Sequence, residues 1–251
     1  MASNKWVLIT GAAGGIGQAL VNEFESNGYL VIACDIAWES NSQYTKTVYR
    51  YKVDLISFVK SSEYRNQFLN DIMLITNGDG ISALINNAAT QILGLARDIT
   101  PKEWTQTWDV NLNSAFLMIQ ILLDSLEHNN GSIVNISSIH ASLSKPGFLA
   151  YATSKAALSA LTRNLALELG KNIRINAIEP AAVETQMLVD GFSETPDKLK
   201  QLNELHPIGR IAKPHEVAEL ALFLCTDKCT FLQGATLSTS GAIHGRLLDP
   251  N

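Results

Sequence analysis

A glycine-rich turn near the start of the chain restricts the fold more than any other stretch. The apolar run from Lys5 to Thr10 is typical of a short buried strand, and a helical pattern follows from Gln18 to Asn27. Between them lies the turn Thr10-Gly11-Ala12-Ala13-Gly14-Gly15-Ile16-Gly17. In a strand–turn–helix unit, the glycines let backbone approach an anion and the helix N-terminus offers free N–H groups. The placement predicts a phosphate-binding turn rather than a merely flexible loop.

Strand-like runs alternate with helical runs along the rest of the chain. The expected strands after the first are 29–34, 48–53, 81–85, 132–136, 173–178 and 235–239. This alternation predicts an α/β fold with a Rossmann-like, doubly wound parallel sheet in three layers, α/β/α. No linker or charge block divides the sequence, so we expect a single domain over residues 1–251. Segment 185–210 is expected to form a substrate lid, and 243–251 a C-terminal tail.

Composition excludes several classes of function. The net charge of −5 and scattered basic residues argue against nucleic acid or an anionic membrane as partner. The longest apolar run, Ala115 to Leu123, falls short of the ~20 residues that a membrane span requires. Cys34, Cys225 and Cys229 lack metal-ligand companions, so free thiols and no metal are expected. We therefore expect a soluble, cytoplasmic protein.

Carboxylates stand at the ends of two expected strands. Asp35 lies about twenty residues beyond the glycine turn, where a carboxylate accepts the two hydroxyls of an adenosine ribose. It would repel a 2′-phosphate, and no basic residue stands at Gly14 or Ile36 to receive one. NAD is therefore favoured over NADP as the cofactor. Asp54, after the third strand, is placed either to touch an adenine edge or to cap the next helix, and both roles remain open.

Ser138, Tyr151 and Lys155 form the second notable group. Ser138 follows the expected strand 132–136, and Tyr151 and Lys155 lie four residues apart on one face of the next helix. A tyrosine pKa near 10 must fall by roughly two to three units, about 3–4 kcal/mol, for base chemistry near neutrality. Alone, a Tyr-x-x-x-Lys pair also occurs with a solvated lysine and a packed tyrosine. Asn111, inside the helical run 102–126, either faces solvent or holds a buried water or a kink.

Together these residues resemble the short-chain dehydrogenase/reductase family, in its single-domain form, over nearly the whole chain. The match is carried by Thr10-Gly11-x-x-x-Gly15-Ile16-Gly17, Asn86-Asn87-Ala88, Asn111, Ser138, Tyr151-x-x-x-Lys155, and Pro180 with Thr185.

The resemblance implies a role for each catalytic residue. Tyr151 would be the general acid/base, Lys155 would lower its pKa and hold nicotinamide-ribose hydroxyls, and Ser138 would orient the substrate oxygen. Asn111 would anchor a water in the proton relay. The nucleotide site implied by the family consists of Gly11, Gly15, Ile16, Gly17, Asp35, Asp54, Leu55, Asn87, Ala88, Tyr151, Lys155, Pro180, Val183 and Thr185.

Three alanines stand where the family usually has glycine. They are Ala89, Ala181 and Ala242. Each adds one methyl group, which would trim the cofactor site or demand a negative φ, but none removes a catalytic group.

The reaction implied is reversible hydride transfer between NAD and a secondary alcohol or ketone. Gln91 and His140 are expected to face the substrate, the alternative being a surface or packing role. Ser-x-His resembles glucose and 3-hydroxybutyrate dehydrogenases, but positions that bind carboxylate in the latter are Phe148 and Val189 here. A small polar substrate, such as a sugar, polyol or hydroxy acid, is therefore preferred.

Two other functions stay open. One is an NADPH-linked 3-oxoacyl-[acyl-carrier-protein] reductase, and the other is a catalytically silent NAD-binding regulatory subunit. The family also implies a homotetramer built from helix pairs around 111–127 and 151–169, unless ordinary core burial explains those apolar faces.

Overall fold

The computed structural model describes residues 5–192 and 196–246, which are built around one sheet. The strand order is β3-β4-β2-β1-β5-β6-β7-β8. All neighbours pair in parallel except β3 and β4, which are antiparallel. The strands are β1 Trp6–Thr10, β2 Leu30–Asp35, β3 Ser42–Gln43, β4 Val48–Lys52, β5 Ala83–Asn86, β6 Ser132–Ile136, β7 Arg174–Pro180 and β8 Thr236–Thr239. The order reverses between β1 and β5, and ligands of such sheets bind at this switch point, beyond the carboxyl ends of the strands.

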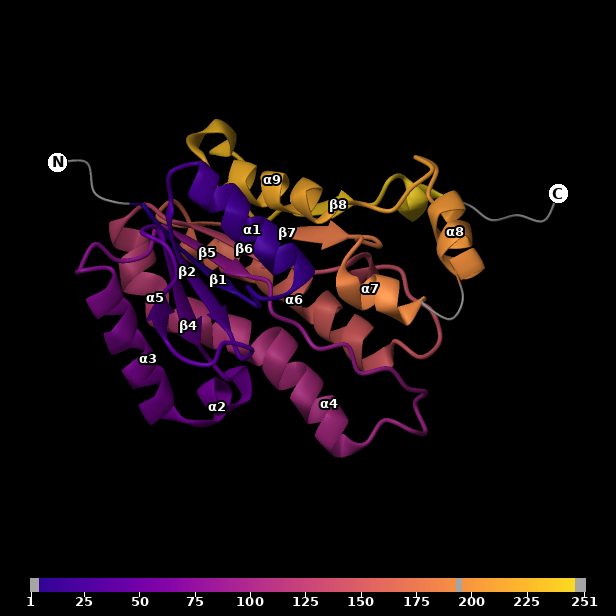
Figure 1. Ribbon diagram of the computed structural model, residues 1–251, viewed down its shortest axis with the longest axis horizontal. Helices are drawn as coiled ribbons and strands as arrows, with labels where there is room; N and C mark the ends of the chain where they lie inside the picture. The colour runs from indigo at the N-terminus through magenta and orange to yellow at the C-terminus, as the bar shows by residue number, and fades with distance from the viewer. Residues whose placement is uncertain (1–4, 193–195, 247–251) are drawn as a thin grey trace.

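Helices cover both faces of the sheet, as Figure 1 shows. α1 and α9 lie on one face, and α3, α5 and α6 lie on the other. The helices are α1 Gly15–Ser26, α2 Leu55–Lys60, α3 Ser62–Ile75, α4 Pro101–Trp108, α5 Ser114–His128, α6 Leu149–Leu169, α7 Gln186–Gly191, α8 Pro196–Leu205 and α9 Pro214–Cys225. The predicted three-layer, doubly wound α/β fold is confirmed.

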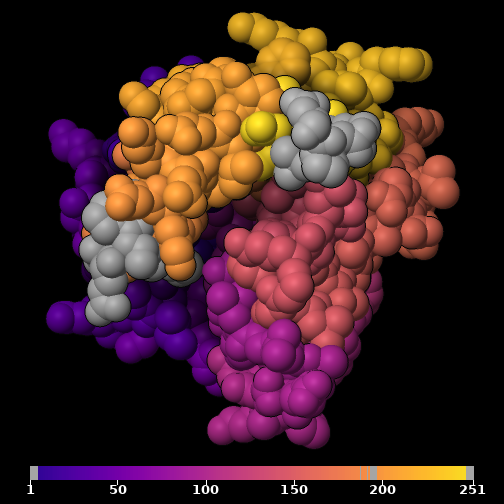
Figure 2. All heavy atoms as spheres, turned by 90° about the vertical axis from the view of Figure 1, so that its right-hand side faces the viewer, coloured from indigo at the N-terminus to yellow at the C-terminus, as the bar shows by residue number. Residues whose placement is uncertain are grey.

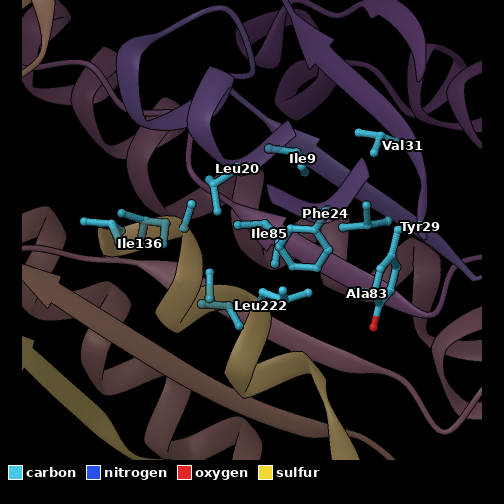
Figure 3. Packing of buried hydrophobic residues seen from close by; sticks show 14 of the residues in the cluster. Ile9, Leu20, Phe24, Tyr29, Val31, Ala83, Ile85, Ile136 and Leu222 are labelled. Atoms are coloured by element: carbon cyan, nitrogen blue, oxygen red, sulfur yellow. The ribbon is translucent and has the colours of Figure 1, made fainter. Parts of the chain in front are cut away.

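Apolar side chains from the strands and from both helix layers form the core. Between the sheet and α1 with α9, Phe24 is fully buried and meets Tyr29 edge to face, with ring centres 5.1 Å apart (Figure 3). Leu20 and Ile9 are also fully buried in this cluster. Burial of each such side chain contributes about 1.5–3 kcal/mol. This packing fixes α1, and with it the glycine turn, on the sheet.

Two expected helices are interrupted in the structure. The predicted helical stretch 58–76 consists of α2 and α3, because Ser61 has an extended backbone and accepts a hydrogen bond from the Tyr64 amide at 3.1 Å. The predicted run 102–126 contains a π turn, Asp109–Asn113, between α4 and α5. The short β3 was not predicted, since two exposed polar residues give no periodic signal.

The expected lid contains α7 and α8, and residues 193–195 between them lie outside the described part. Thr185 caps α7 by accepting a hydrogen bond from the Leu188 amide at 3.3 Å. Of the expected tail, 243–245 form a 3-10 turn, and 247–251 lie outside the described residues.

Within residues 5–192 and 196–246, no helix has the length and apolar character needed to cross a membrane. The same residues contain no group of three or more histidine, cysteine or acidic side chains placed to hold a metal ion. Cys34, Cys225 and Cys229 are free thiols.

Candidate active site

At Gly11, Gly15 and Gly17 the glycine turn is packed so tightly that it has no room for a Cβ. Gly11 has φ +65°, and a Cβ on Gly17 would lie 2.0 Å from the Gly11 carbonyl oxygen. A Cβ on Gly15 would lie 2.9 Å from the Thr185 methyl group. The turn is thereby brought against Thr185, although the two are far apart in the sequence.

Asn87 and Ala88 join the ends of β1 and β5. The Asn87 side-chain amide donates to the carbonyls of Thr10 and Gly11, both at 3.0 Å. The backbone amides of Asn87 and Ala88 donate to the Thr10 hydroxyl at 3.0 and 3.1 Å. The Thr10 hydroxyl therefore positions the backbone of Asn87 and Ala88, a role that the sequence motif did not reveal.

Asp35 ties the glycine turn to the end of β2. Its Oδ2 accepts from the Ala13 amide and its Oδ1 from the Ala37 amide, both at 2.9 Å. Arg50, on the neighbouring strand β4, is stacked on Trp38 and Tyr44, with its guanidinium carbon 4.4 and 3.4 Å from the two ring centres.

Asp54 caps α2, one of the two roles left open. Its Oδ1 accepts from the Ile56 amide at 3.0 Å and its Oδ2 from the Ser57 hydroxyl at 2.7 Å. Leu55, the first residue of α2, is buried. Asp54 also lines a surface cavity of about 410 Å³ at the end of β4, together with Ser40, Asn41, Tyr51, Lys52, Tyr64 and Gln67.

The structure brings Ser138, Tyr151 and Lys155 together beyond the end of β6. Ser138 caps a 3-10 turn, its hydroxyl accepting from the His140 amide at 3.2 Å, and its side chain is hydrogen-bonded to Tyr151. Lys155, one helical turn after Tyr151, donates from Nζ to the Ile136 carbonyl at 2.7 Å. The ammonium lies 5.8 Å from the centre of the Tyr151 ring.

Burial controls the protonation of this group. Burial raises the pKa of Tyr151, and the hydrogen bond from Ser138 opposes that rise. Burial lowers the pKa of Lys155 to about 7. Burial is thus the largest influence on the pKa of Tyr151 in this structure, and the expected lowering by Lys155 stays a prediction.

Asn111 is buried, so the expected alternative that it faces solvent is wrong. It lies in the π turn and is 1% exposed. Its Oδ1 accepts from the Thr90 amide at 2.8 Å, and its Nδ2 donates to the Thr90 carbonyl and the Ser154 hydroxyl at 3.0 and 2.9 Å. The side chain thus holds the segment after β5 against α6, while the proposed water relay stays a prediction.

A buried row of polar groups behind Lys155 escaped the sequence analysis. The Ser159 hydroxyl donates to Glu179 Oε1 at 2.7 Å and lies 2.8 Å from the Ser137 hydroxyl. Ser137 also donates to the Lys155 carbonyl at 2.9 Å. The available signal was spacing, since Ser137 precedes Ser138 and Ser159 follows Lys155 by one helical turn. These contacts fix α6 to the ends of β6 and β7.

The remaining nucleotide-site residues follow β7. Pro180 ends the strand, and Val183 is buried. Ile16 is partly buried in the cluster between α1 and the sheet. Ala242 adopts φ +69°, so the negative φ expected of an alanine there is wrong. The surrounding turn imposes this left-handed backbone conformation at a cost of about 1–2 kcal/mol.

The two expected substrate residues differ in their surroundings. His140 is stacked on Phe148 with ring centres 4.4 Å apart, and meets Tyr151 edge-on at 5.9 Å. Gln91 is exposed on the segment after β5, and its substrate role stays a prediction. In Figure 2 the surface is hollowed between the orange segment with α7 and α8 and the magenta to pink segment of the chain's middle.

Known proteins resemble the whole chain. A family model described as enoyl-(acyl carrier protein) reductase matches residues 11–244. The 3-oxoacyl-[acyl-carrier-protein] reductase FabG of Thermotoga maritima is 34% identical over 244 residues, covering 95% of this chain and 97% of the relative.

Two solved structures show the same architecture. Ligand-free aldohexose dehydrogenase of Thermoplasma acidophilum matches with a TM-score of 0.88 at 28% identity, covering 99% of this chain and 98% of that one. ElxO with NADP bound matches with a TM-score of 0.86 at 26% identity, covering 97% and 100%. With its tyrosine, lysine and serine gathered at the sheet edge, the chain belongs to the short-chain dehydrogenase/reductase family of oxidoreductases, which bind a nicotinamide cofactor.

Proposed function

We propose that the protein is an NAD-dependent oxidoreductase that transfers hydride reversibly between NAD and a secondary alcohol or ketone on a small polar molecule. The observation that carries the proposal is the meeting of Ser138, Tyr151 and Lys155 beyond the end of β6. The glycine turn and Asp35 stand at the same edge of the sheet.

The residues around the turn fit a dinucleotide. Gly14, the N-cap of α1, supplies no side-chain hydrogen bond, so the first-turn amides are left for phosphate oxygens. Each Asp35 oxygen accepts one backbone hydrogen bond, and a carboxylate offers about four lone-pair sites. Two acceptor sites therefore remain for ribose hydroxyls. Val183 and Thr185 would hold the nicotinamide end.

The chain's own residues would handle the proton while the bound nucleotide supplies or accepts the hydride. In alcohol oxidation, Tyr151 would take the proton from the substrate hydroxyl, and in reduction it would return it to the same oxygen. Ser138, already hydrogen-bonded to Tyr151, would orient that oxygen. Lys155 would hold ribose hydroxyls, and such partners favour its ammonium form, which burial disfavours.

The preference for NAD rests on Asp35. A variant Asp35→Asn removes the negative charge and keeps one acceptor oxygen for the backbone amides. We expect it to weaken NAD binding about tenfold and to weaken NADP binding less, because the repulsion of a 2′-phosphate is lost. Calorimetry with both nucleotides measures these affinities. A wild-type protein that binds NADP much more tightly than NAD would overturn the assignment.

An NADPH-linked 3-oxoacyl-[acyl-carrier-protein] reductase remains the second candidate, since the Thermotoga relative is named a 3-oxoacyl-[acyl-carrier-protein] reductase. Asp35 and the lack of a basic residue at Gly14 or Ile36 disfavour it. Acetoacetyl thioester reduction, assayed beside sugars, polyols and hydroxy acids with both nucleotides, separates the two. Thioester turnover with NADPH alone would replace our proposal with this one.

A silent NAD-binding regulatory subunit is disfavoured by the intact catalytic group. It would gain support if Tyr151→Phe left a cellular phenotype unchanged while Gly15→Asp abolished it.

We also propose that the protein forms a homotetramer through α5 and α6. Large apolar side chains are exposed on these helices, with Phe116 40%, Leu149 44% and Leu167 83% exposed. Sedimentation of the wild type and of Leu167→Asp would test this, and a monomeric wild type would refute it. The three free thiols support a reducing, cytoplasmic location.

A further inference from the structure

A second surface cavity lies between α6 and β8, the strand at the edge of the sheet. Its volume is about 450 Å³, within the range of about 300–1,000 Å³ that is usual for small-molecule pockets. None of the residues that line it belongs to the proposed catalytic group or to the proposed nucleotide site. Its polar lining includes two oppositely charged side chains and four hydroxyl groups, which belong to Glu179 and Arg163 and to Ser142, Ser159, Thr236 and Ser238.

The Glu179 carboxylate is buried in this cavity without a cationic partner. The residue is 7% exposed, and its Oε1 accepts a hydrogen bond from the Ser159 hydroxyl at 2.7 Å. Among residues 5–192 and 196–246, no basic side chain lies within 4.0 Å of its oxygens. Arg174, on the same strand, instead donates to the Leu224 and Thr226 carbonyls at 2.7 and 3.1 Å. Because a carboxylate removed from water is stabilised by an opposite charge, Glu179 favours a ligand that brings a positive group.

Arg163 places the opposite charge in the outer part of the same cavity. It is exposed and follows Ser159 by four residues on α6, about 6 Å along the helix axis. In the described part of the chain its guanidinium forms no ion pair, although Glu179 lines the same cavity. A guanidinium binds a carboxylate through two parallel hydrogen bonds. The inner end of the cavity therefore favours a positive group on a ligand, and the outer end a negative one.

We propose that this cavity binds an amino acid, with the ammonium of the ligand on Glu179 and its carboxylate on Arg163. The hydroxyl groups of Ser142, Thr236 and Ser238 can accept the remaining N–H groups or donate to the carboxylate. A simple anion would be repelled by Glu179, and a simple cation by Arg163, so only a zwitterion satisfies both ends. The proposal concerns a binding site outside the proposed active site and does not depend on the dehydrogenase function.

Calorimetry and thermal shift on the full chain test the site, with the proteinogenic amino acids, β-alanine and γ-aminobutyrate as probes. The carboxamide and the N-acetyl derivative of the amino acid that binds are the matched controls, because each lacks one of the two charges. We expect the amino acid to bind at least tenfold more tightly than either derivative. Binding of none of the probes, or equal binding of either derivative, would overturn the proposal.

Two variants each remove one charge from the cavity. Glu179→Gln keeps an oxygen that can accept from the Ser159 hydroxyl, and Arg163→Gln removes the guanidinium. Each should weaken amino-acid binding at least tenfold. Glu168→Gln removes a charge from an exposed position on the same helix, outside the cavity, and should leave the affinity unchanged. Since Arg163 is exposed, its variant remains informative even if Glu179→Gln fails to fold, and an unchanged affinity in it would refute the contact.

The same titration in saturating NAD separates this cavity from the nucleotide site. Amino-acid binding should persist, because no lining residue is shared between the two sites. Exclusion of the amino acid by NAD would place it in the nucleotide site and overturn the proposal. Lack of turnover with every alcohol, sugar, hydroxy acid and thioester would count against the dehydrogenase function alone and leave the amino-acid site standing.

Discussion

The proposed nucleotide half and the proposed substrate half of the site are constructed differently. Around the glycine turn, backbone atoms approach so closely that a Cβ on Gly17 would lie 2.0 Å from a carbonyl oxygen. Asp35 and Asn87 complete this half with four hydrogen bonds to backbone groups. On the proposed substrate side, His140 is held by ring contacts, and Gln91 and Val189 are exposed.

The difference shows where this chain can change without losing its fold. Close backbone contacts leave no tolerance for an added atom. Side chains on turns and short helices can be exchanged with small effects on stability, because little backbone depends on them. Substitutions in the nucleotide half should therefore affect all substrates, and those in the substrate half only some.

The largest effect is expected at Gly17. In Gly17→Ala the new methyl group meets the Gly11 oxygen and two Ala12 atoms at 2.0, 2.7 and 2.9 Å, so the turn must rearrange. We expect loss of measurable NAD binding by calorimetry and a lower melting temperature. Gly14→Ala is the matched control, since its Cβ would lie 3.5 Å from the same oxygen, an ordinary contact. Equal behaviour of the two variants would show that the turn is not rigid.

Tyr151→Phe comes next, at the border of the two halves. It removes the hydroxyl that exchanges the proton, and we expect kcat to fall by a factor on the order of 10³ with NAD affinity largely retained. Stopped assays and calorimetry on the same sample measure both quantities. A near-normal kcat would exclude this tyrosine as the general acid/base.

Lys155 should make stability depend on pH. Its pKa falls from 10.5 to about 7 on folding, so between these values the unfolded chain binds more protons than the folded protein. The free energy of unfolding should therefore rise with pH across this window, by roughly 1.4 kcal/mol per pH unit from this residue. Below about pH 7 both states are protonated and the slope disappears.

Lys155→Met supplies the reference for that measurement. Urea unfolding of the nucleotide-free wild type and variant at pH 7 and pH 9.5 gives the change in the free energy of unfolding of each protein. Subtracting one change from the other cancels the contributions of the other titrating groups. Parallel pH dependence of the two proteins would mean that the buried amine stays protonated.

The smallest effect is expected at Phe148. Phe148→Leu removes the ring that supports His140 while keeping an apolar side chain, so KM for the true substrate should rise about threefold to tenfold with NAD affinity unchanged. Leu143→Ala, on the same segment and 43% exposed, is the control and should change neither quantity. If NAD affinity falls while KM rises, the two halves are coupled more tightly than the contacts indicate.

Local patterns were sufficient to place the catalytic groups. Short-range sterics and hydrophobic periodicity predict a strand, a glycine turn and a helix. Residues four apart lie on one face of a helix, so Tyr151 and Lys155 share a face. The strand ends that carry Asp35, Asn87 and Ser138 meet because parallel strands end at one edge. These features depend on neighbours in the sequence, so the sequence by itself determined the fold class and the proposed catalytic group.

Contacts between distant segments decided the rest. Burial raised the Tyr151 pKa and lowered that of Lys155, and desolvation depends on everything packed around a group. The hydrogen bonds between Asn111 and Thr90 and from Ser159 to Glu179 join segments about twenty residues apart. The His140–Phe148 stack depends on how a turn folds back. No local pattern encodes such pairings, because they exist only once the helices and strands have packed together.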